Sequence, residues 1–163
     1  MAAVESAIQT GLKKIPAKAT AEQWQGDTPW SVAVKAAILG VGRDFDWLTA
    51  ANGCETDEGK EWLYDVVWYQ ADKAGHMTDV PLVAECEWQG EPWIKEDFEK
   101  LLVARSKYRV MVFQANSEES VRGLFGKMHL WVSKFHRTSL GDRYLLVGWS
   151  WKEGRWVFDL YVY

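Results

Sequence analysis

Apolar residues in the first 41 positions recur at the spacing of α-helices. One stripe runs over residues 4–15 at intervals of three and four, which predicts an amphipathic helix that Pro16 ends. Residues 17–27 are polar and predict a connector. A second stripe predicts a helix over residues 29–41, because Thr28 can serve as its N-cap and a proline suits its first turn. Two glycines are expected to end this helix, Gly40 and Gly42.

Most of the remaining chain alternates between β-type and helical patterns. Segments that are rich in aromatic and β-branched residues, or that alternate in polarity, predict strands over residues 44–49, 62–69, 80–88, 108–113, 143–151 and 155–163. The first of them precedes a turn at Asn52 and Gly53, and the last two form a hairpin. One helix is expected after Pro92 and a longer one after Ser117, whose hydroxyl can cap it. The order α-α-β-β-β-α-β-α-β-β predicts an α/β (α+β) fold with helices flanking a mixed central β-sheet.

Length and composition agree with a single domain over residues 1–163. The chain is 48% apolar and can bury one core. Its formal net charge of −4 means that a nucleic-acid partner would need a local basic patch. The start does not resemble a signal peptide and no apolar run approaches a membrane span, which predicts a soluble, cytoplasmic protein with no membrane partner. The two cysteines, Cys54 and Cys86, are expected to be free thiols, and Cys86 a buried structural one.

Eleven tryptophans are the main departure in composition. They are expected to belong mostly to the core, because aromatic residues spread along strands usually pack inside. The aromatic residues of the terminal hairpin, Trp156 among them, are expected to be structural. The alternative is a stacking platform for sugars or bases.

Three carboxylates on two predicted strands need an explanation. Asp65 interrupts an apolar strand, and burial of an ionised carboxylate without a partner is costly. Glu85 and Glu87 stand two residues apart on the next strand and project from one face. If the strands pair as an antiparallel meander with Tyr69 across from Pro81, Asp65 lies directly across from Glu85.

Such a cluster would repel itself unless one group is protonated or a divalent cation binds. Oxygen ligands favour Mg²⁺ or Mn²⁺ over Zn²⁺. The alternative is that Glu85 and Glu87 lie at a solvated strand end while a backbone or arginine partner neutralises Asp65. The spacing leaves both interpretations open.

The placement of these acids resembles the PD-(D/E)XK nuclease superfamily, whose core is a helix, a three-strand meander, a helix and a strand. Asp65 and Glu85-Cys86-Glu87 follow one another on consecutive predicted strands, and residues 29–114 cover that core in order, with a helix and hairpin over residues 117–163 beyond it. The resemblance implies a restriction-endonuclease-like core. It also implies that Asp65, Glu85 and the carbonyl of Cys86 bind Mg²⁺ or Mn²⁺.

Two positions depart from the superfamily pattern. Glu87 stands where a lysine is usual, although some restriction endonucleases of the superfamily also have glutamate there. Glu87 would then orient water or a second ion. Many members supply a glutamate from the first core helix, whereas residues 29–41 contain no acid and Lys35 is their only charged residue.

A lysine displaced to the helix after Pro92 is a further catalytic candidate. Lys100 lies roughly 200° from Phe98 on a helical wheel, so it is expected at the surface or in contact with a phosphate. Lys95 lies roughly 60° from Phe98 and flanks the apolar stripe more closely.

Basic residues form two runs that could contact phosphates, although a solvated face is the commoner arrangement: Lys127, Lys134, His136 and Arg137, and Arg105, Lys107 and Arg109. The function implied by the resemblance is Mg²⁺-dependent hydrolysis of phosphodiester bonds in nucleic acid, DNA or RNA, with DNA as the expected partner. The first alternative is a catalytically inactive nuclease-fold protein that binds or regulates. The second is a sugar-binding or sugar-cleaving protein that uses the tryptophans and the paired carboxylates. The oligomeric state, a dimer included, is left open.

Overall fold

A computed structural model describes residues 3–51, 53 and 62–163 of the protein, which is mixed α/β with a six-stranded mixed sheet flanked by helices. This confirms the predicted fold class at that level. The chain divides into two compact units, Met1–Val83 and Ala84–Tyr163, and strand β3 (Met77–Glu87) contains the boundary. The predicted turn at Asn52 and Gly53 falls partly outside the described residues, and Cys54 falls wholly outside them.

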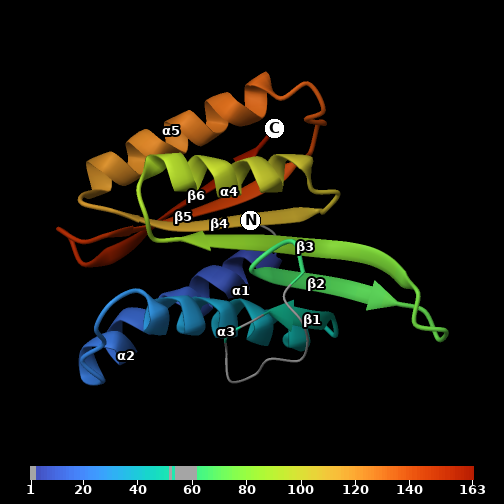
Figure 1. Ribbon diagram of the computed structural model, residues 1–163, viewed down its shortest axis with the longest axis horizontal. Coiled ribbons are helices and arrows are strands. Elements are labelled where there is room, and N and C mark those ends of the chain that lie inside the picture. The colour runs from blue at the N-terminus through green and yellow to red at the C-terminus, as the bar shows by residue number, and fades with distance from the viewer. Residues whose placement is uncertain (1–2, 52, 54–61) are drawn as a thin grey trace. The chain divides into compact units, whose positions relative to one another are not determined.

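The first unit packs helices against a small antiparallel β-layer. Its elements are α1 (Ala3–Leu12), α2 (Ile15–Ala21), α3 (Thr28–Asp44), β1 (Leu48–Ala51), β2 (Val66–Ala71) and the start of β3. β1 and β2 pair antiparallel with Ala50 opposite Val67, and α3 packs on both strands and on α1 (Figure 1). The buried core between these elements includes Ile8, Leu12, Val34, Ile38 and Trp68.

Two predictions about helix ends in this unit were wrong. Pro16 does not simply end a helix, because it occupies the first turn of α2, where its missing N–H costs nothing. The supposed polar connector is therefore helical as far as Ala21. Gly42 lies inside α3, where a Cβ atom would come within 2.7 Å of Trp68 Nε1 and Thr49 Cγ2. This glycine permits a close approach between helix and strands, and it is not a stop signal.

The first predicted strand was misplaced as well. Residues 44–49 were expected to be extended, but α3 continues to Asp44 and Asp46 has a left-handed backbone with φ 59°. β1 therefore begins at Leu48. In the second predicted strand, residues 62–65 are irregular, so β2 begins at Val66.

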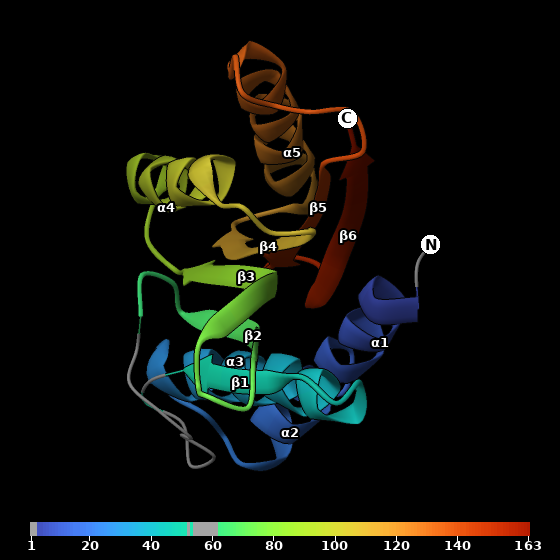
Figure 2. The ribbon, with the colours of Figure 1, turned by 90° about the vertical axis from the view of Figure 1, so that its right-hand side faces the viewer.

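The second unit is an α/β layer built on the end of β3. Its elements are α4 (Glu91–Val103), β4 (Tyr108–Ala115), α5 (Glu118–Lys134), β5 (Arg143–Ser150) and β6 (Arg155–Val162). β4 pairs parallel with β5, and β5 pairs antiparallel with β6. Both helices lie on one face of these strands (Figure 2). Their apolar stripes bury Phe98 and Leu101 from α4, and Val121, Met128 and Val132 from α5.

The predictions for this unit are confirmed in outline. The hydroxyl of Ser117 caps α5 by accepting a hydrogen bond from the backbone N–H of Ser120. The terminal hairpin forms, and Trp149 lies opposite Trp156 with the two rings 5.1 Å apart and both buried. Among the described tryptophans, five are buried and three are exposed, so the core interpretation is right for the first group alone.

The strands follow one another in the sheet in the order β1-β2-β3-β4-β5-β6. Among residues 3–51 and 62–163, no helix has the length and apolar character needed to span a membrane.

Candidate functional site

Glu85 and Glu87 lie at the end of β3 in the second unit. The residue Glu85 is 3% exposed, whereas Glu87 is partly buried. The idea that both glutamates occupy a solvated strand end is therefore wrong for Glu85. Cys86 stands between them and is partly exposed, so its expected burial is incomplete.

Helix α4 brings a lysine to this strand end. The Nζ atom of Lys100 lies 3.5 Å from Glu85 Oε1 and 2.7 Å from Asp97 Oδ1. The wheel angle from Phe98 placed Lys100 away from the apolar stripe, and its side chain is indeed 45% exposed. Its long stem nevertheless carries the ammonium group to the buried carboxylate. The expected surface position of Lys100 is thus confirmed, and its contact with Glu85 adds to it.

Asp97 is a site residue that the sequence reasoning did not single out. It lies three positions before Lys100 on α4, and this spacing places two side chains on neighbouring parts of a helix surface. Asp97 also raises the pKa of Glu87 through its negative charge. The i,i+3 pairing of acid and base was the signal that could have identified it.

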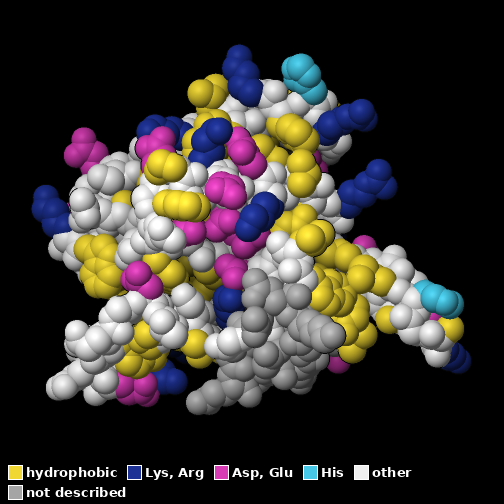
Figure 3. All heavy atoms as spheres, viewed as in Figure 1, with side chains coloured by type: hydrophobic (Ala, Val, Ile, Leu, Met, Phe, Trp, Pro, Cys, Tyr) yellow, Lys and Arg dark blue, Asp and Glu magenta, His cyan; other side chains and the backbone are white. Residues whose placement is uncertain are grey.

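The charged groups of this cluster shift one another's pKa values. Burial is the main cause that raises the pKa of Glu87, and the charge of Asp97 adds to it, while the backbone N–H of Gln89 donates to Glu87 Oε1 at 2.6 Å and opposes the shift. The pKa of Lys100 lies above its usual range, chiefly because of its hydrogen bond to Asp97, so the group is an ammonium ion at neutral pH. When ionised, the carboxylates of Glu85, Glu87 and Asp97 outnumber this ammonium. Acidic side chains gather around basic ones over α4 (Figure 3).

Asp65 belongs to the first unit and has its own partner there. It directly precedes β2 and does not interrupt a strand as predicted. Lys35 of α3 places its Nζ atom 2.7 Å from Asp65 Oδ1, and both side chains are largely buried. The helix that lacks the glutamate of the superfamily pattern thus supplies Lys35, whose ammonium group neutralises Asp65. The expected pairing of Asp65 across from Glu85 stays a prediction.

The donor chemistry of the second unit suits a hard cation. Within the described part of the chain, no group of three or more His, Cys, Asp or Glu side chains is arranged to hold a metal ion. Mg²⁺ is commonly held by one or two carboxylates together with substrate phosphates, and carboxylate oxygens such as those of Glu85 and Glu87 are the ligands that it prefers. These two residues therefore fit the ion by ligand type. The roles expected for Asp65 and for the Cys86 carbonyl stay predictions.

Arg109 proves to be a structural residue. It is 6% exposed, donates through Nη2 to the carbonyl oxygen of Ala104 at 2.9 Å, and pairs with Asp142 at 3.3 Å. Its guanidinium also lies over the ring of Tyr144. Buried Arg109 therefore fits neither of the two interpretations that the sequence offered, a phosphate contact and a solvated face.

Among the other basic candidates, two have local ion-pair partners and two line a separate cavity. Lys127 binds both carboxylate oxygens of Glu91 at 2.6 Å, and Lys95 pairs with Glu99 at 2.8 Å. A cavity of about 580 Å³ is lined by several residues that include the exposed arginines Arg105 and Arg137. These two remain available for contact with an anion.

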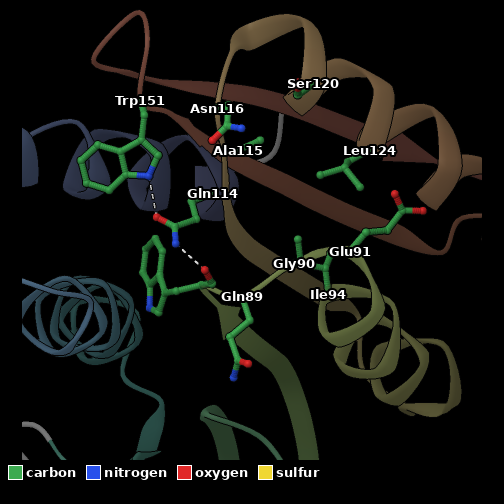
Figure 4. A pocket seen from close by; sticks show the side chains of 11 residues that line it. Gln89, Gly90, Glu91, Ile94, Gln114, Ala115, Asn116, Ser120, Leu124 and Trp151 are labelled. Atoms are coloured by element: carbon green, nitrogen blue, oxygen red, sulfur yellow. Dashed lines mark hydrogen bonds between the residues drawn. The ribbon is translucent and has the colours of Figure 1, made fainter.

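A polar pocket of about 320 Å³ lies near Glu87, at the ends of β3 and β4. Figure 4 shows Trp151 and Gln114 on one side of it, with Glu91 and Leu124 on the other. The indole Nε1 of Trp151 donates to Gln114 Oε1 at 2.6 Å, and the amide of Gln114 donates to the carbonyl oxygen of Trp88. Trp151 was expected to be structural with the rest of the hairpin, but it is 50% exposed.

Comparison with models of known protein families, with curated proteins and with solved structures gives no match. The function must therefore follow from the chemistry of the two units. The cluster of Glu85, Glu87, Asp97 and Lys100 is the strongest candidate, because it joins a buried carboxylate, two further acids and a lysine ammonium group.

Proposed function

We propose that this protein is a Mg²⁺-dependent nuclease of the PD-(D/E)XK type, in which Lys100 takes the role that a lysine at position 87 would have. The observation that carries the proposal is the 3.5 Å distance between Lys100 Nζ and Glu85 Oε1. The superfamily pattern has a lysine beside the second acid, and Glu87 stands in the place of that lysine. Lys100 reaches the second acid, Glu85, from the following helix and so restores the pairing of a carboxylate with an ammonium group. The departure at position 87 then no longer counts against activity.

The order of elements supports this proposal. The sequence α3-β1-β2-β3-α4-β4 has the helix, three strands, helix and strand of the superfamily core. The strands β1 to β4 are also neighbours in that order. The two acids occupy the end of the third strand, and the lysine comes from the helix that follows it.

Each residue would have a distinct task in hydrolysis. Glu85 and Glu87 would hold Mg²⁺ or Mn²⁺, and the resemblance adds the Cys86 carbonyl and Asp65 as further ligands. The ion, when bound, would supply an activated water and neutralise charge on the leaving oxygen. The Lys100 ammonium would stand beside the scissile phosphate and stabilise its developing charge. Asp97 would keep Lys100 in place through the 2.7 Å contact.

The second candidate function is an inactive nuclease-fold protein that binds or regulates. The ion pair between Lys35 and Asp65 favours it, because it neutralises a carboxylate that active members use for metal. Under that interpretation the acidic cluster of the second unit would be a binding surface or a structural network.

A cleavage assay separates the two functions. The substrates are a supercoiled plasmid, a single-stranded DNA and an RNA of matched sequence, each with Mg²⁺, with Mn²⁺ or with a chelator. The nuclease proposal predicts products only with the metals, and none from Glu85→Gln. If the folded wild-type protein leaves all three substrates intact, the inactive protein is favoured. Cleavage that survives in Glu85→Gln would place the activity elsewhere.

A further inference from the structure

The pocket beside Glu87 has the position of a ligand site. It opens where β3 and β4 end and where α4 and α5 begin (Figure 4). In open α/β sheets, ligands commonly bind in the crevice outside the carboxyl ends of the strands. The backbone N–H of Gln89, a lining residue, donates to Glu87 Oε1 at 2.6 Å, so the pocket borders the proposed catalytic cluster.

Trp151 forms an aromatic wall that is exposed and yet held in place. Half of the residue is open to solvent. Its Nε1 donates to Gln114 Oε1 at 2.6 Å, and its ring meets the ring of Trp149 edge-on at 5.9 Å. The amide of Gln114 is itself anchored, because its nitrogen donates to the carbonyl oxygen of Trp88. A large exposed ring that is fixed on both sides can stack on a ligand with little loss of side-chain entropy.

The polar groups of the pocket are mostly uncharged amides and hydroxyls. The lining residues Gln89 and Asn116 carry amide side chains, and Ser120 carries a hydroxyl. The one carboxylate in the lining is that of Glu91, and Lys127 neutralises it with two contacts of 2.6 Å. Amide side chains match the donor and acceptor edges of nucleobases.

Size restricts the ligand further. A volume of about 320 Å³ lies at the lower end of the roughly 300–1,000 Å³ typical of small-molecule sites. It suits one flat ring system better than a chain of sugar units. A base inside a duplex cannot enter such a pocket, because its faces are stacked and its edge is paired.

We infer that this pocket binds one unpaired nucleobase, stacked on Trp151, of the nucleic acid that is cleaved at Glu85 and Glu87. The substrate class would then be single-stranded or locally unpaired nucleic acid. The choice of a nucleobase over another flat polar ring rests on the proposed function.

Binding can be measured without cleavage. The probe is a fluorescein-labelled single-stranded DNA of mixed sequence, titrated with the full protein in a chelator and followed by anisotropy. Wild type is compared with Trp151→Ala, Trp151→Phe and Trp93→Ala. Trp93 is a matched control, because it is 52% exposed in the same unit and does not line the pocket. Thermal unfolding of each variant verifies that it is folded.

Replacing by alanine an aromatic side chain on which a base stacks typically weakens binding by about 5- to 100-fold, and this is the loss of affinity expected for Trp151→Ala. Trp151→Phe should keep most of the affinity, since a smaller ring remains, and Trp93→Ala should bind as wild type does. The same sequence as a duplex should bind wild type more weakly than the single strand, and Trp151→Ala should abolish this preference.

Three results would overturn the inference. They are equal affinity of Trp151→Ala and wild type, an equal loss in Trp93→Ala, and Trp151-dependent binding of a glucose hexasaccharide in place of DNA. Binding that depends on Trp151 but is accompanied by no cleavage with Mg²⁺ would refute the nuclease proposal and leave the base pocket standing. Cleavage that does not depend on Trp151 would refute the base pocket and leave the nuclease proposal standing.

Discussion

Removing the ammonium group of Lys100 should expose how strongly it interacts with Glu85. At their 3.5 Å separation, two unit charges attract by about 1 kcal/mol in water and about 5 kcal/mol at an effective dielectric constant near 20. The Glu85 side chain is 4% exposed but that of Lys100 is 45% exposed, so solvent screens much of the attraction. We expect a coupling energy of about 1–2 kcal/mol.

A double-mutant cycle measures this coupling directly. The free energy of unfolding is obtained from urea denaturation at neutral pH for wild type, Glu85→Gln, Lys100→Met and the double variant. The double variant should be less destabilised than the sum of the single variants by the coupling energy. The matched control is the same cycle on Lys95 and Glu99, an exposed i,i+4 pair at 2.8 Å, for which about 0.3–0.5 kcal/mol is expected.

The outcome decides whether the cluster is an interacting unit. A coupling no larger than that of the control pair would refute the reasoning, since it would mean that Lys100 and Glu85 interact no more strongly than an exposed surface pair. A coupling that disappears in high salt to the same extent as the control would show that the Glu85 contact is as exposed as a surface pair.

Three further predictions concern stability. Trp156→Ala should cost about 3–5 kcal/mol in urea denaturation, because it removes a buried ring that packs on Trp149, and an unchanged midpoint would show that the hairpin is not part of the core. Gly148→Ala should cost about 1–3 kcal/mol, because its Cβ would meet Val121 Cγ1 at 2.2 Å, and Val121→Ala in the same chain should recover part of the loss; no such recovery would contradict the packing. The guanidinium of Arg155, followed by that of Arg122, lowers the pKa of Glu118 below its usual value of 4.5, so the stabilisation is present above that pH and is lost as the pH falls through the lower value in the folded protein. Glu118→Gln should therefore reduce the melting temperature at neutral pH, and the difference from wild type should shrink in acid; a difference independent of pH would exclude a charge effect.

Local sequence signals were sufficient for most of the second unit. The apolar stripe of α4, the cap at Ser117 and the alternation along the terminal hairpin act over a few residues, and each element formed where its pattern predicted. The helix ends of the first unit depend on contacts between distant residues. Gly42 is needed because α3 approaches Trp68, and a pattern within the helix contains no information about that approach.

The candidate site was predicted only in part, because it too depends on contacts between residues that are distant in sequence. Alternation along a strand placed Glu85 and Glu87 together, but the ion pair of Glu85 with Lys100 depends on α4, which lies beyond the strand in sequence. A wheel angle describes where a Cβ atom points, whereas the ammonium of Lys100 lies at the end of a long stem that can reach past the helix edge. The partner of Asp65 was foreseen as an arginine or backbone group and is Lys35.

The most direct test of the proposed nuclease is single-turnover cleavage of a labelled single-stranded DNA with Mg²⁺ by wild type, Lys100→Met, Lys95→Met and Glu85→Gln. If Lys100 stabilises charge on the scissile phosphate, its loss should slow cleavage by about 10²- to 10³-fold. Lys95→Met should cleave at nearly the wild-type rate, because Lys95 is paired with Glu99 on the surface of the same helix. Glu85→Gln should be inactive. Cleavage by Lys100→Met at the rate of Lys95→Met would contradict the role of the displaced lysine, and a folded wild-type protein without any cleavage would contradict the nuclease itself.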